Sequence, residues 1–168
     1  VWLDCVEAES DGFDSYWTPS GGSDALTLLA LAGGRTSRIE LGTAVVPIFQ
    51  QHPAAMAQQA LTTQVATNGR LALGIGLSHK PSVENEMGLS FDRPALRMLE
   101  YVTVLRELVQ EGRTRFSGET LSVSASVQVP GGSAFPILVA ALGPRMLRIA
   151  GEIAGGTATW MVGPRPIK

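Results

Sequence analysis

The sequence is poor in the residues that build disulfide frameworks and metal sites. It has one cysteine, Cys5, and two histidines, His52 and His79, among 168 residues. A single cysteine excludes an internal disulfide, and so few sulfur and imidazole ligands predict no metal centre. We expect Cys5 to be an inert thiol, buried on the helical face that also carries Ala8.

Charge and long apolar runs are also scarce. Charged residues make up 17% of the chain and the net charge is −2, which gives no basic surface for nucleic acid or an anionic membrane. The longest apolar runs have the length of strands, so we expect no transmembrane helix. With 45% hydrophobic residues, the composition predicts one globular α/β domain over residues 1–168 and a cytoplasmic location.

Apolar runs alternate with helical patterns along the chain. This alternation predicts a parallel sheet covered by helices, and the continuous character of the runs indicates strands buried on both faces. A sheet of about five strands could stand open or belong to an eight-stranded barrel. The expected strands are residues 14–17, 39–45, 71–76, 136–142 and 157–161, and the expected helices are 1–11, 25–32, 53–68, 92–111 and one from 144.

Two stretches depart from this simple alternation. Residues 113–130 consist of short alternating pieces, which predict one or two small strands inserted outside the main sheet. Residues 77–91 form a long polar connection after the third expected strand, and α/β enzymes keep their sites in such loops. The helix over 92–111 carries an apolar stripe that we interpret as core: Met98, Tyr101, Val102, Leu105, Leu108 and Val109.

A glycine turn precedes the last expected helix and predicts an anion-binding site at the helix N-terminus. The strand 136–142 ends at Gly143, and Pro144 and Arg145 start the helix, whose apolar side holds Leu147, Ile149, Ala150 and Ile153. The first N–H groups of a helix have no partner within it and carry the positive end of the dipole. The turn is therefore either a phosphate seat or an ordinary strand-to-helix connection.

Other candidate side chains have alternative interpretations. Gly74 and Gly76 begin a dinucleotide fingerprint, but His79 stands where the third glycine is required, so the glycines instead indicate close approach by another group, such as a flat ring. His79 is either a proton-shuttling group or a surface histidine. We expect His52 to shape the entry to the helix at Pro53.

Two further groups are expected to have no catalytic role. The acidic residues Asp4, Glu7, Glu9 and Asp11 are interpreted as a solvated helical face. Trp160 is expected in the core, or else on the wall of a pocket.

Several segments in order resemble one known family. They read RIELGTAVVP, HPAAMAQQALTTQVATNGRLALGIGLSH, SFDRP and VAALGPRMLRIAGEIAGGTATWM. Together they resemble the bacterial luciferase-like oxidoreductases, and most closely the branch that uses the deazaflavin coenzyme F420. The resemblance implies a (β/α)8 TIM barrel, of which this chain would hold about strands two to six.

The resemblance also implies a cofactor site. In the family, a strand-end bulge with a non-proline cis peptide backs the deazaflavin ring. The resemblance places cofactor contacts at the bulge, at the following strand end and at the glycine turn. His79 follows that strand end, so it is our candidate for the catalytic residue. The implied cofactor-binding residues are Thr43, Ala44, Val45, Val46, Gly74, Gly76, Ser78, Ala140, Ala141, Gly143, Pro144, Arg145 and Met146.

From the resemblance we expect an oxidoreductase that transfers hydride between reduced coenzyme F420 and a small organic substrate, as part of a homodimer. One alternative is an FMN-dependent monooxygenase of the same superfamily. The chain starts at Val1 rather than Met, inside an expected helix, so the other alternative is a truncated piece without turnover.

Overall fold

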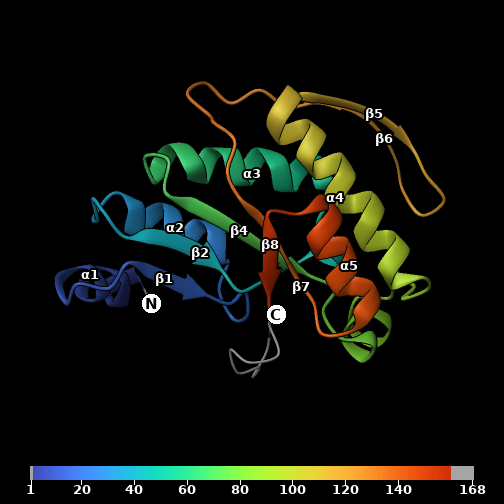
Figure 1. Cartoon of the computed structure of the whole chain (residues 1–168), viewed down its shortest axis with the longest axis horizontal. Helices are drawn as coiled ribbons and strands as arrows, with labels where there is room; N and C mark the ends of the chain where they lie inside the picture. The colour runs from blue at the N-terminus through green and yellow to red at the C-terminus, as the bar shows by residue number, and fades with distance from the viewer. Residues whose placement is uncertain (1, 160–168) are drawn as a thin grey trace.

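One parallel sheet organises the molecule (Figure 1). The computed structural model describes residues 2–159. The sheet has six strands, and five of them follow the order β1-β2-β4-β7-β8 with every pair parallel, while β3 pairs with β4. The strands are β1 (Ser15–Thr18), β2 (Glu40–Thr43), β3 (Val46–Pro47), β4 (Leu71–Gly76), β7 (Ile137–Ala140) and β8 (Gly156–Ala158).

The strand order shows that the sheet is a piece of barrel wall. Each new strand is added on the same side of the one before it, so the order never reverses as it does in a doubly wound sheet. The helices pack against one another in chain order, as they do around a TIM barrel. They are α1 (Trp2–Ser10), α2 (Ala25–Gly33), α3 (Pro53–Ala66), α4 (Pro94–Glu111) and α5 (Pro144–Ile153).

A two-stranded hairpin lies outside this sheet. It joins β5 (Arg113–Ser117) to β6 (Ser122–Ser126) in antiparallel register and lies along α4. The buried Glu100 carboxylate on α4 holds the hairpin turn, because it accepts the backbone N–H groups of Glu119 at 2.7 Å and Thr120 at 2.8 Å. Burial alone would raise the pKa of Glu100, but these bonds and the Thr120 hydroxyl lower it.

Local sequence signals explain where the helices begin. The Asp24 carboxylate caps α2 by accepting the N–H of Thr27 at 2.7 Å. His52 caps α3 in the same way, since its Nδ1 accepts the N–H of Ala54 at 3.2 Å, so the expectation that His52 shapes this helix entry is confirmed. The apolar stripe of α4 is buried throughout, as its spacing predicts.

Cys5 is buried, with 1% of its surface exposed. Burial, followed by the neighbouring Asp4, raises the pKa of its thiol to about 11, so the group stays protonated and unreactive at neutral pH.

Glu9 is not simply part of a solvated face. Its carboxylate accepts the backbone N–H groups of Ile39 at 2.8 Å and Arg38 at 2.7 Å, and so fixes the segment that leads into β2. The acidic spacing along the helix could not reveal this contact, because the partners lie about thirty residues away in the chain.

Several local features also differ from expectation. The strand expected over 39–45 is broken at Ala44, the connection 77–91 contains the π-helical turn η2 (Ser82–Glu86), and the helix expected from Asp92 begins at Pro94. Leu147 is 42% exposed, because α5 packs through Ile149 and Ala150. Trp160 and the end of the last expected strand lie outside the described residues.

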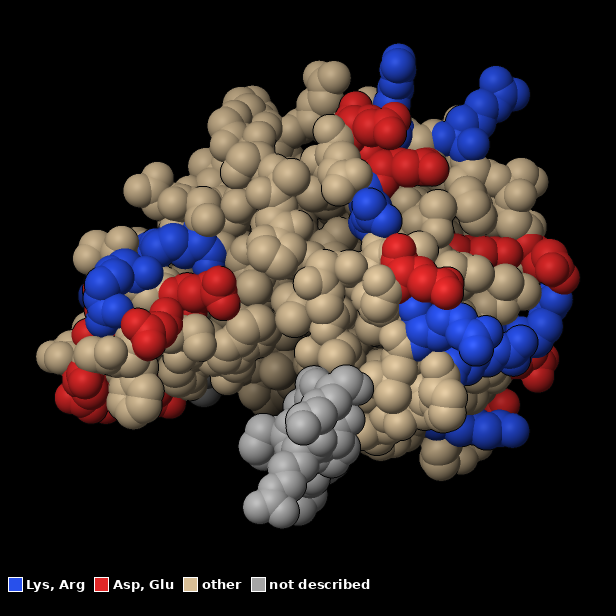
Figure 2. Space-filling model, in the orientation of Figure 1, with Lys and Arg blue, Asp and Glu red and all other residues tan. Residues whose placement is uncertain are grey.

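The outer surface carries both signs of charge. In Figure 2 acidic and basic side chains lie next to one another over the region of α4 and α5 rather than in a patch of one sign. Within residues 2–159, no helix has the length and apolar character needed to cross a membrane.

Candidate functional site

The break between β2 and β3 forms a bulge at the carboxyl edge of the sheet. The peptide bond between Ala44 and Val45 is cis, as the family resemblance implies. Thr43 closes the gap behind it, because its hydroxyl donates to the carbonyl of Gly74 and accepts the N–H of Gly74, both at 2.8 Å. Thr43 is fully buried whereas Ala44 is exposed, so the bulge is anchored from behind and presents Ala44 outward.

The glycines of β4 make room for this bulge. A Cβ atom on Gly74 would lie 2.0 Å from the Thr43 carbonyl oxygen, and one on Gly76 would lie 2.5 Å from Val45 Cγ2. The sequence correctly indicates close approach at both positions. The approaching group, however, is the chain's own bulge and not a flat ring, because the bulge occupies the space that side chains would need.

Gly76 also connects the bulge to β7. A Cβ atom added to Gly76 would also lie 3.4 Å from the Cβ atom of Ala140. β3 and β7 pair with β4 on its two sides, and Val45 and Ala140 both lie close to Gly76 at the carboxyl end of β4. Residues that the resemblance takes from three separate segments are therefore neighbours in the structure.

The turn after β7 is open. Gly143 is the N-cap of α5 and Pro144 occupies its first turn, and no side chain caps this N-terminus. A Cβ added to Gly143 would meet nothing within 4 Å, and Arg145 is exposed beside it. The first N–H groups of a ten-residue helix thus face free space next to a cation, which is the arrangement that binds anions.

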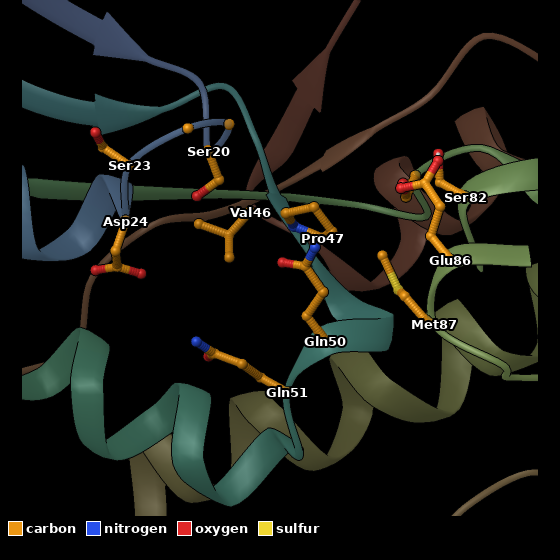
Figure 3. A pocket seen from close by; sticks show the side chains of 13 residues that line it. Ser20, Ser23, Asp24, Val46, Pro47, Gln50, Gln51, Ser82, Glu86 and Met87 are labelled. Carbon is orange, nitrogen blue, oxygen red and sulfur yellow. The ribbon is translucent and has the colours of Figure 1, made fainter.

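A cavity of about 390 Å³ lies beside the bulge at the carboxyl ends of β1, β3 and β4. Figure 3 shows its wall, with Asp24 on one side, Glu86 on the other and Gln51 extending into the hollow between. Of the candidate cofactor residues, Val46 and Ser78 line it. The full lining is Ser20, Gly21, Gly22, Ser23, Asp24, Val46, Pro47, Gln50, Gln51, Ser78, Ser82, Glu86 and Met87.

Most of these residues are absent from the sequence-based candidates. The segment 20–24 is interpreted from sequence only as the approach to α2, and residues 50–51 are not singled out. Their position after the ends of β1 and β3 is the signal that could have indicated them, because barrel enzymes build their sites from such connections.

His79 lies at the start of the long connection after β4. Its side chain is exposed and does not line the cavity. Its backbone carbonyl accepts the N–H of Val83 at 3.0 Å, and its imidazole makes no hydrogen bond to any of residues 2–159. Its catalytic role stays a prediction.

Comparison with known proteins assigns the family. The family model described as luciferase-like monooxygenase matches residues 5–168. The chain belongs to this family. The matched range includes the bulge, the cavity wall and the glycine turn, and the partial TIM barrel is confirmed as the fold class.

Individual relatives of the family agree with this assignment. An F420-dependent glucose-6-phosphate dehydrogenase of Microbacterium testaceum is 34% identical over 171 residues, which cover 92% of this chain and 50% of the relative. An uncharacterized protein of Mycobacterium tuberculosis is 34% identical over 160 residues, which cover 90% of this chain and 47% of that protein. The chain thus spans about half the length of the curated relatives it matches.

A solved structure of the family superimposes closely. The coenzyme F420-dependent tetrahydromethanopterin reductase of Methanopyrus kandleri has a TM-score of 0.80 and 26% identity, over 95% of this chain and 52% of that one. The similarity in three dimensions supports the interpretation of the sheet as part of a TIM barrel.

Proposed function

We propose that this chain carries the deazaflavin-binding part of an F420-dependent oxidoreductase, which transfers hydride between the cofactor and a small organic substrate. The observation that carries the proposal is that Val45 of the bulge and Ala140 at the end of β7 both lie beside Gly76, and that β7 leads directly into the open helix start at Gly143. Relatives named as F420-dependent enzymes support the choice of cofactor.

The residues present fit such a cofactor. A flat ring needs a surface without protruding side chains, and the bulge presents the small, exposed Ala44 over a firmly held backbone. A phosphate needs donors and positive charge, and the uncapped start of α5 supplies both together with Arg145. The missing side chain of Gly143 leaves space for the group to reach the backbone.

The coenzyme, when bound, supplies the hydride chemistry, and the chain supplies position and surroundings. In this proposal the bulge backs the ring, Ala140 and Ala141 flank the linker, and Gly143–Met146 hold the phosphate. Gly74, Gly76 and Thr43 act indirectly, because they set the shape of the bulge. Val46 and Ser78 belong to the wall that separates cofactor and substrate from water.

Three other parts of the proposal rest on the sequence and the resemblance. They are proton transfer by His79, a homodimer and a cytoplasmic location. The activity of a whole protein is also part of the proposal, because the matched region covers only about half the length of the curated relatives.

Parallel titrations with coenzyme F420 and FMN test the proposal. Purified protein should quench the fluorescence of F420 with saturable affinity and should bind FMN at least tenfold more weakly. Tighter binding of FMN would favour the flavin monooxygenase alternative. Binding of neither cofactor would contradict the proposal and favour a piece without turnover.

A further inference from the structure

A second cavity, of about 360 Å³, lies where the start of α4 meets the turn of the β5–β6 hairpin. It shares no lining residue with the cavity beside the bulge. The lining residues are Phe49, Leu89, Ser90, Asp92, Arg93, Arg97 and Thr120. The wall therefore combines two arginines with apolar side chains.

Arg97 carries a positive charge without a counter-ion. Its side chain is half-buried, and its one hydrogen bond to residues 2–159 runs from Nη1 to the carbonyl of Thr120. No carboxylate of these residues lies within 4 Å of the guanidinium. A partly buried cation is costly unless an anion and hydrogen-bond acceptors accompany it.

The guanidinium of Arg97 can still be reached by a ligand. Its Nε is buried and accepts no visitor, but Nη2 is accessible and has no partner among residues 2–159. Nη2 carries two N–H donors. Donors on a guanidinium bind carboxylate and phosphate oxygens more strongly than neutral acceptors, because both partners are charged.

The other charges at this cavity leave the charge of Arg97 in place. Arg93 is paired with Glu119 at 2.6 Å. The Asp92 carboxylate is exposed and accepts the hydroxyl of Ser90 at 2.6 Å, and water screens an exposed charge more than a half-buried one. The start of α4 adds the positive end of a helix dipole, since no side chain caps it. The balance beside Arg97 therefore favours an anion.

The rest of the wall suits an apolar group. Phe49 stacks on Phe91 with ring centroids 5.4 Å apart, which holds the Phe49 ring in position. Leu89 is 44% exposed although its side chain is large and apolar. A ligand with an apolar body would remove this surface from water.

We propose that this cavity binds a small organic anion, a carboxylate or a phosphate monoester. Its charged head pairs with Arg97, and its apolar body packs on Phe49 and Leu89. The site is separate from the proposed cofactor site and does not depend on it.

Calorimetric titration of the protein tests the ligand class. The probes are benzoate, phenyl phosphate and inorganic phosphate, with benzamide as the uncharged control. We expect benzoate or phenyl phosphate to bind saturably and at least tenfold more tightly than benzamide and inorganic phosphate, and the tighter of the two identifies the head group. Binding of neither organic anion, or equally tight binding of benzamide or inorganic phosphate, would overturn the proposal.

Arg97→Met removes the charge and keeps an apolar stem, and it should weaken binding of the organic anion at least tenfold. Arg115→Met is the matched control, because Arg115 is exposed on β5 outside the cavity and its loss changes the net charge equally. It should leave the affinity unchanged. Equal affinities for wild type and Arg97→Met would overturn the role of Arg97.

Leu89→Asp provides a second test that leaves Arg97 and its bond to Thr120 in place. It adds a carboxylate to the cavity at an exposed position, and Leu89→Asn adds a neutral group of nearly the same shape. The aspartate variant should bind the organic anion at least tenfold more weakly than the asparagine variant. Equal affinities for the two variants would contradict an anion site here, also where Arg97→Met does not melt cooperatively.

Discussion

Replacing Gly74 with alanine should disrupt the bulge from behind. The new Cβ would stand 2.0 Å from the Thr43 carbonyl oxygen, where ordinary contact begins at 3.4 Å. Thr43 cannot withdraw freely, because its hydroxyl both donates to and accepts from the Gly74 backbone. Overpacking of about 1–3 kcal/mol and the loss of two hydrogen bonds of about 1 kcal/mol each together predict a destabilisation of roughly 3 kcal/mol or more.

Chemical and thermal denaturation followed by circular dichroism measure this loss. For a chain of this length, roughly 3 kcal/mol corresponds to a fall in the melting temperature of about 6–12 °C. Gly151→Ala is the matched control, since Gly151 is an exposed helical glycine whose added Cβ meets nothing within 4 Å. It should be neutral or stabilise by up to about 1 kcal/mol. A Gly74→Ala protein as stable as this control would refute the argument that the bulge fills the space at β4.

Three further predictions concern single side chains. Arg70→Lys should cost about 2 kcal/mol in urea denaturation, because the guanidinium donates to three backbone carbonyls between α2 and β2 and lysine cannot reproduce the fork. Hydrogen bonds from Ile39, Arg38 and Ser37 lower the pKa of Glu9 to about 2, so its stabilising contribution is complete above the unfolded value near 4.5 and is lost as the pH falls through the folded value. Glu9→Gln should therefore melt at a lower temperature than wild type at pH 7, with a difference that shrinks between pH 4.5 and pH 2; a constant difference would contradict the assignment. His79→Ala should change stability by less than about 0.5 kcal/mol while lowering F420-dependent turnover about 100-fold, and turnover within a few-fold of wild type would leave His79 a surface residue.

The fold follows from sequence signals that act locally. The apolar run at residues 71–76 becomes β4 with the expected bounds, and the Pro53 and Pro144 signals mark the first turns of α3 and α5. These features depend on backbone geometry and side-chain periodicity, which a single sequence displays directly. The bulge at Ala44 was implied by the family resemblance and is not a consequence of apolar periodicity.

The site was less accessible to prediction because it depends on contacts between distant segments. Nothing near Glu9 in the sequence indicates that it binds residues 37–39. Nothing near Gln51 indicates that its amide donates to Gln59, whose own amide donates to Asp24. The glycines of β4 also show what a sequence alone cannot predict. Their lack of side chains indicates a close neighbour, but only the structure shows that the neighbour is the bulge.

The affinity of F420 for a Gly143→Leu protein tests the proposed cofactor seat most directly. Gly143 has an extended backbone and its added Cβ meets nothing within 4 Å, so leucine should leave the fold intact and project into the space in front of α5. The account predicts that Gly143→Leu binds F420 more than tenfold more weakly than wild type, a loss above about 1.4 kcal/mol, while Gly151→Leu binds it as wild type does. Equal affinities for all three proteins would contradict the placement of the cofactor at this helix start.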